Sequence, residues 1–264
     1  MSTRTAPAGP EAGGRRSRHR RRAAARSGAA IALKSAIGAV AALAALAPQA
    51  GARTPAVVSS PQQLVRLLTT HQVHVSHGAG SATVAEIGPW RPITGGATVL
   101  PVTARATSAS GARWLRILVP GRPNGRQGWI EQRGTQLGTT RWKLAVRTAS
   151  RRVIAYRDGR VVRIFAAVVG KPSTPTPHGS FFVEESVRVA AGGSGGPFAL
   201  ATSARSRVLQ EFDGGPGQIG IHGVRHLGGV PGTAVSHGCV RLADRAIRWL
   251  AARIGSGTRV TITR

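Results

Sequence analysis

The chain has 264 residues, 4% aromatic residues, 35 glycines and a formal net charge of +28 at pH 7. Such a charge often indicates a nucleic-acid-binding protein, but arginine supplies 34 of the 37 basic residues and is scattered along the chain, so we do not expect nucleic acid as a partner. Catalysis by paired carboxylates is excluded for the one adjacent acidic pair, because Glu184 and Glu185 would point to opposite faces of a strand.

Residues 1–52 have the pattern of an export leader. Eight arginines lie within the first 27 residues, and the following 20 are apolar except for Lys34 and Ser35. Small residues at 50–52 then provide a site for signal peptidase. We expect a cleaved secretory signal peptide; the alternative is an uncleaved anchor, since about 20 apolar residues can span a bilayer. Either way, the sequence predicts an extracytoplasmic protein, and we expect it to meet the membrane only through this leader, if the leader is uncleaved.

Residues 53–84 are predicted to form a linker and one short helix. Ser60 can cap the helix, and Pro61 suits its first turn. The apolar residues that recur at helical spacing are Leu64, Leu67 and Leu68. We expect this small amphipathic helix to be structural.

Residues 85–140 consist of short apolar runs separated by glycine and proline, which is typical of β structure. Apolar residues alternate after Trp114, the PGRPNG stretch at 120–125 is a strong turn signal, and a strand resumes at Trp129. The segment resembles the small SH3-like β modules of bacteria, and we expect it to position its neighbour or to bind cell wall. A β-subdomain that only packs on the following residues is an equal alternative.

Residues 141–264 are predicted to be a second, mainly β domain with one main helix. Asp158-Gly159 marks a hairpin turn between two strands, and the helix is expected at 244–254. Further strands are expected at 179–187, 219–222 and 258–263. The glycine-rich stretch at 190–200 predicts a mobile loop or a lid over a cleft.

Cys239 is the only cysteine, and it lies in the stretch SHGCVRL with His237 two positions and His222 seventeen positions before it. A lone thiol near an imidazole is the pattern of a cysteine nucleophile, because the imidazole can take the thiol proton. Gly238 would let the backbone turn sharply and aim N–H groups at an oxyanion. The alternatives, which we do not favour, are an inert buried cysteine and a zinc site. The four ligands of the zinc site would be His222, His226, His237 and Cys239.

These residues strongly resemble the catalytic motif of the L,D-transpeptidase (YkuD) family. That motif is a histidine followed by glycine or serine, a variable loop, and S-H-G-C-x-R, and the chain has His222-Gly223 and SHGCVR at 236–241. A second match, VVGKPSTPTPHGSF at 168–181, resembles the family's G-K-x-x-T-P-T-P-x-G signature. Two motifs in the family's order are more specific than either alone. The resemblance covers roughly residues 142–264.

The resemblance implies a YkuD-like β-sandwich or barrel catalytic domain at 141–264, without cofactor or metal. Cys239 would attack a peptide carbonyl, His222 would act as its base, and the N–H groups of His237, Gly238 and Cys239 would hold the oxyanion. Gly223 would orient the His222 ring through its carbonyl. Ser236 would bond to His222 or to substrate, and Arg241 would bind a substrate carboxylate.

The function implied is that of an exported peptidoglycan L,D-transpeptidase of the kind that carbapenems block. Cys239 would form a thioester with the third residue of a tetrapeptide stem, release D-alanine, and pass the acyl group to an amine of a neighbouring stem. If water takes the acyl group, the enzyme is an L,D-carboxypeptidase. The alternative from another class is a non-catalytic wall-binding protein whose basic surface binds anionic wall polymers.

Overall fold

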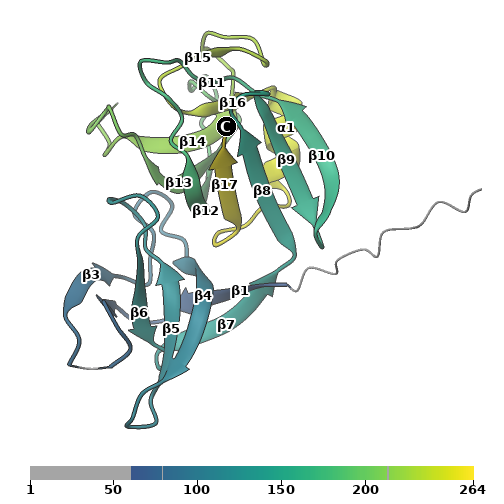
Figure 1. Ribbon diagram of the computed structural model, residues 1–264. Helices are drawn as coiled ribbons and strands as arrows, with labels where there is room; N and C mark the ends of the chain where they lie inside the picture. The colour runs from purple at the N-terminus through teal and green to yellow at the C-terminus, as the bar shows by residue number, and fades with distance from the viewer. Residues whose placement is uncertain (1–60, 79, 213) are drawn as a thin grey trace, which may run out of the picture. The chain divides into compact units, whose positions relative to one another are not determined.

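The structure is a computed structural model that describes residues 61–264 except 79 and 213. The described residues are mainly β, with two large sheets and a single helix, which confirms the predicted fold class (Figure 1). The predicted leader at 1–52 and Ser60 lie outside the described residues. No helix in the described part of the chain is both long and apolar enough to cross a membrane.

The first sheet has seven strands in the order β3-β2-β6-β5-β4-β1-β7. Their bounds are β1 Gln62–Leu67, β2 His71–His74, β3 Thr83–Ile87, β4 Val99–Thr107, β5 Arg113–Leu118, β6 Gln127–Glu131 and β7 Thr135–Thr140. The strands enclose a core of their own that includes Val65, Leu100, Leu115 and Ile130.

The prediction of a short helix after Ser60 is wrong, because this stretch forms strand β1 and the start of strand β2. β1 lies between β4 and β7 and pairs antiparallel with both, with Val65 opposite Leu100 on one side and Leu137 on the other. Leu64, Val65 and Leu67 are all buried by this pairing. The backbone hydrogen bonds of β1 to β4 and β7 outweigh the helical spacing of the leucines, since tertiary contacts override the intrinsic helix or strand preference of a segment.

The second sheet has eight strands in the order β10-β9-β8-β17-β12-β13-β14-β16, as Figure 1 shows for β8, β17 and β12. Their bounds are β8 Trp142–Arg147, β9 Arg152–Arg157, β10 Arg160–Ala166, β12 Gly179–Arg188, β13 Phe198–Arg205, β14 Gln218–Gly223, β16 Val240–Leu242 and β17 Arg259–Thr263. The predicted turn joins β9 to β10, with φ of 53° at Asp158 and 75° at Gly159. A third strand, β8, precedes the two that the pattern predicted.

Strand β14 and the short strand β16 form a parallel pair, with His222 opposite Arg241. Helix α1, Asp244–Ala251, follows β16 directly and buries Ala246, Ile247 and Leu250 in the core of the second sheet. A small parallel pair of β11, Val169–Gly170, and β15, Ala234–Ser236, holds the chain on the other side of residues 237–239. Both flanks of Cys239 are therefore fixed by strands.

Strand β12 belongs to both cores. Successive side chains of a strand point to opposite faces, so Phe181 packs in the core of the second sheet and Phe182 packs in the core of the first. Both rings are almost completely buried. The two sheets are thus joined by shared apolar packing as well as by the backbone.

Candidate active site

A large cleft of about 1210 Å³ contains Cys239, His222, His237 and Arg241. Cys239 lies in the turn between β15 and β16, and His222 lies near the end of the neighbouring strand β14. Apolar side chains line much of the remaining wall, among them Val187, Phe212, Leu227 and Val230. The structure therefore brings the predicted thiol and imidazole into one cleft.

The ring of His222 is oriented by the next residue in the chain. Nδ1 lies 2.8 Å from the Gly223 carbonyl oxygen, so Nδ1–H donates this bond and Nε2 carries no proton when the ring is neutral. Burial lowers the pKa of His222, the Gly223 hydrogen bond opposes this, and the charge of Arg241 lowers it further. The imidazole is therefore neutral at pH 7 and able to accept a proton.

The sulfur of Cys239 accepts a hydrogen bond from the Gly220 N–H, with a nitrogen to sulfur distance of 3.4 Å. Burial raises the pKa of the Cys239 thiol, while the Gly220 N–H and the charge of Arg241 act in the opposite direction. The resting site thus holds a neutral thiol and a neutral imidazole. The thiolate forms when a base takes the proton.

The turn at 236–239 is closed by the hydroxyl of Ser236. Ser236 Oγ donates to the Cys239 carbonyl at 2.6 Å and accepts a hydrogen bond from the Gly238 N–H at 3.1 Å. The hydroxyl therefore bonds to backbone groups of the turn and not to His222, which was one of its two expected partners. The Gly238 N–H is thus already engaged, and Gly238 has a φ of 120° that side chains rarely adopt. Among the described residues, the N–H groups of His237 and Cys239 have no acceptor. These two N–H groups are therefore free to donate, which is what an oxyanion site requires.

Arg241 and His237 take different positions around the thiol. Arg241 lies beside His222 across the β14–β16 ladder, and its guanidinium donates to the Gly228 carbonyl. The His237 ring is exposed and lies 5.7 Å from the Phe212 ring. His226 lines the cleft from a loop with a φ of 56°. No group of three or more histidine, cysteine or acidic residues could hold a metal ion within the described part of the chain.

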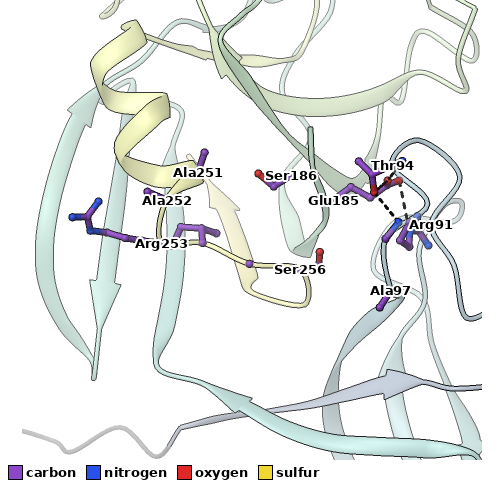
Figure 2. Close-up of a pocket in the computed structure, with 12 residues that line it drawn as sticks. Arg91, Thr94, Ala97, Glu185, Ser186, Ala251, Ala252, Arg253 and Ser256 are labelled. Carbon is purple, nitrogen blue, oxygen red and sulfur yellow. Dashed lines mark hydrogen bonds and ion pairs between the residues drawn. The ribbon is translucent and has the colours of Figure 1, made fainter. Parts of the chain in front are cut away.

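The loop between β3 and β4 contributes residues to the cleft that the sequence did not reveal. Arg91 and Ile93 line it, and the loop that carries them is held by Glu185 of β12. The Glu185 carboxylate accepts from the Thr94 N–H and from the Thr94 hydroxyl, each at 2.8 Å (Figure 2). Figure 2 also shows the residues of this loop and those after α1 that line a second cavity. This cavity has a volume of about 430 Å³. Of the two cavities, the larger cleft contains the thiol.

Two threonines of the TPTP stretch also reach the site. Thr174 Oγ1 donates to the Ser236 carbonyl at 3.2 Å, and Thr176 Oγ1 donates to the Gly238 carbonyl at 2.8 Å. The stretch resembles a family signature, but its pattern indicated no role for the hydroxyls. Two threonines that alternate with prolines at 174–177 are the signal that could have identified them.

The glycine-rich stretch predicted as a loop or lid packs against the strand that carries His222. The Gly223 N–H donates to the Gly195 carbonyl at 2.8 Å, and the Gly195 N–H donates to the Arg225 carbonyl at 2.7 Å. A Cβ atom on Gly195 would lie 2.8 Å from His222 Nδ1. Glycine at this position therefore leaves room for the imidazole.

Replacing Gly195 with alanine is expected to slow acylation of Cys239 by about 10²-fold, because misplacing a reacting group by about 1 Å costs on that order. Gly192→Ala is the matched control: Gly192 has a φ of 83°, close to the 76° of Gly195, but a Cβ there meets nothing within 4 Å. The measurement is the rate of adduct formation with a carbapenem. Equal rates for the two variants would contradict a specific contact with His222.

Comparison with known proteins gives concordant matches. The family model described as the L,D-transpeptidase catalytic domain, YkuD, matches residues 141–262. A Bacillus licheniformis protein named as an L,D-transpeptidase, YkuD, is 33% identical over 125 residues, which cover 47% of this chain and 67% of that protein.

Solved structures with similarity to the chain include two L,D-transpeptidases. One from Enterococcus faecium is 22% identical with a TM-score of 0.37, and the match covers 46% of this chain and 49% of that one. The chain thus spans about half the length of that structure. One from Mycobacterium tuberculosis is 17% identical with a TM-score of 0.40, and covers 75% of this chain and 96% of that one.

Proposed function

Since this chain belongs to the L,D-transpeptidase (YkuD) family, we propose that it is an exported peptidoglycan L,D-transpeptidase with Cys239 as its nucleophile. One observation carries the proposal: a thiol and an imidazole held by the Gly223 carbonyl occupy the same cleft. The N–H groups of His237 and Cys239 support it, because they remain available for an oxyanion.

In the proposed acylation step, His222 Nε2 takes the proton of Cys239 as Sγ attacks the carbonyl carbon of the third stem residue. The carbonyl oxygen becomes an oxyanion, which accepts hydrogen bonds from the His237 and Cys239 N–H groups. As the intermediate collapses, the bond to the terminal D-alanine breaks, and His222 returns the proton to the departing amine. The acyl group is left as a thioester on Cys239.

In the proposed second step, an amine of a neighbouring stem attacks the thioester and gives a proton to His222. The Cys239 sulfur leaves and recovers its proton, and the new amide joins the third residues of two stems. Water in place of the amine would give an L,D-carboxypeptidase. Arg241 beside His222 supports recognition of an anionic stem, because a guanidinium pairs well with a carboxylate.

Export remains part of the proposal and is supported by the composition of residues 1–52, where a basic segment precedes an apolar one. Peptidoglycan stems lie outside the cytoplasmic membrane, so the location of the proposed substrate is consistent with export by this leader. The excess of basic residues would also favour contact with anionic wall polymers.

Replacing Cys239 with alanine is expected to abolish covalent labelling by a carbapenem, because the lone cysteine is the proposed acceptor. The measurement is the intact mass of protein lacking residues 1–52, with and without the carbapenem, for wild type and Cys239→Ala. One adduct per chain on the wild type alone supports an activated nucleophile. A folded wild type without an adduct would contradict it.

Incubation with disaccharide-tetrapeptides then separates the possible acceptors. Both reactions release D-alanine in the acylation step, but a transpeptidase produces cross-linked dimers, whereas a carboxypeptidase produces tripeptides and no dimers. Binding of Cys239→Ala to intact cell wall with no turnover by the wild type would instead favour a non-catalytic wall-binding protein.

A further inference from the structure

Hydroxyl groups fix the backbone of the turn that carries Cys239. The Ser236 carbonyl accepts from Thr174 Oγ1 at 3.2 Å and from the Lys171 N–H at 2.9 Å. The Gly238 carbonyl accepts from Thr176 Oγ1 at 2.8 Å. Together with the two bonds of the Ser236 hydroxyl, these contacts engage the polar groups on both sides of the thiol.

The orientation of a carbonyl determines the orientation of the N–H that follows it. A trans peptide unit is planar, and its C=O and N–H point in opposite directions. Thr176 donates to the Gly238 carbonyl, which shares a peptide unit with the Cys239 N–H. Thr174 donates to the Ser236 carbonyl, which shares a peptide unit with the His237 N–H. Neither the His237 N–H nor the Cys239 N–H has an acceptor among the described residues.

The threonines are themselves held rigidly. Thr176 Oγ1 accepts the Gly170 N–H at 2.9 Å, so its proton points to the Gly238 carbonyl. Thr176 is 3% exposed, and Thr174 is 7% exposed. Gly170 is paired with Ser236 in the parallel β11–β15 ladder, and backbone atoms of the TPTP stretch leave no space for a Cβ on it. Hydroxyls and turn are therefore anchored to the same pair of strands.

We infer that Thr174 and Thr176 are positioning residues that aim the oxyanion-binding N–H groups of His237 and Cys239. They do not touch the substrate; they act through the two peptide units that carry these donors. The inference rests on the proposed acyl-transfer function. Its distinctive consequence is that the hydroxyls matter for attack on a carbonyl and not for reactivity of the thiol itself.

The test compares Thr176→Val, which removes the hydroxyl, with Thr176→Ser, which keeps it. Two reactions of Cys239 are measured on each protein. Transfer of the acetyl group from p-nitrophenyl acetate forms a thioester, releases p-nitrophenol and passes through an oxyanion. Alkylation by iodoacetamide displaces iodide at a saturated carbon and needs no oxyanion site.

We expect Thr176→Val to slow acetyl transfer by roughly 10- to 100-fold, less than the 10²–10³ that follows complete loss of an oxyanion donor. Thr176→Ser should stay within about threefold of the wild type, and iodoacetamide alkylation should be unchanged in both. An equal loss in both reactions, or no loss of acetyl transfer in Thr176→Val, overturns the inference.

Thr174→Val and Thr174→Ser provide a second pair that places less demand on folding. The Ser236 carbonyl keeps its bond from the Lys171 N–H when the Thr174 hydroxyl is absent, so no buried carbonyl is left unpaired. The same selective loss, at the lower end of the range, is expected for Thr174→Val. The ester probe contains no peptidoglycan, so a wild type that reacts with it but not with stem peptides would refute the proposed substrate and leave this test valid.

Discussion

Replacing His222 with asparagine is expected to slow acylation of Cys239 at pH 7 by roughly 10²–10⁴-fold, which is the usual contribution of a general base. Burial raises the pKa of the Cys239 thiol, so little thiolate exists at pH 7 without a base to remove the proton. The rate of carbapenem adduct formation measures the loss. His178→Asn is the control, because His178 is exposed and bonds to Thr148 rather than to cleft residues.

The acylation rate is also expected to depend on pH, because the charge of His222 changes with pH. Only the neutral imidazole is a base, and burial lowers the pKa of His222, so the wild-type rate should fall with decreasing pH through a value below the ordinary 6.5. The His222→Asn variant should lose this limb and keep rising toward alkaline pH as the thiol ionises. An acid limb clearly above pH 6.5 would contradict a His222 pKa that burial lowers.

Replacing Glu184 with alanine is expected to destabilise the protein by about 3–5 kcal/mol, the usual effect of leaving a buried ion pair without one partner. Glu184 is 1% exposed and pairs with Arg91 of the loop between β3 and β4 and with Arg205 of β13. Burial lowers the pKa of Arg205 to about 10, with nearby Arg122 adding to the effect. Removing the carboxylate therefore leaves two guanidinium groups largely withdrawn from water.

Thermal unfolding provides the measurement, with a drop in Tm of about 6–20 °C for a domain of this size. Glu211→Ala is the matched control: Glu211 is exposed, and its loss should change stability by less than about 0.5 kcal/mol. Glu184→Gln should fall between the two. A Glu184→Ala variant that melts with the wild type would show that the cluster contributes little to stability.

Local patterns in the sequence predicted the elements that depend on neighbouring residues. The Asp158-Gly159 turn is found where its turn chemistry placed it, and helix α1 begins at the predicted Asp244 but ends at Ala251, three residues before the predicted end. Cys239 and His222 were likewise singled out by residue type and spacing. The turn and the helix are each determined within a few residues of chain, where pattern and structure coincide, whereas the roles of Cys239 and His222 stay predictions.

Features that depend on distant residues could not be predicted in this way. The leucines of β1 have helical spacing, and only the presence of β4 and β7 on both sides makes the segment a strand. The bond from Thr176 to the Gly238 carbonyl joins residues 62 positions apart. No periodicity indicates such a contact, and the same holds for Arg91 and Ile93 in the cleft wall.

The position of β17 has a consequence for the order of folding. This strand comes after all the other described strands in sequence, yet it lies inside the second sheet, where it pairs with β8 on one side and β12 on the other. Arg147 and Thr263, partners in the β8–β17 ladder, are 116 positions apart. Such non-local pairing is slow to form. Until residues 259–263 are in place, the sheet is divided into two halves, and a nascent chain cannot complete the domain that carries Cys239.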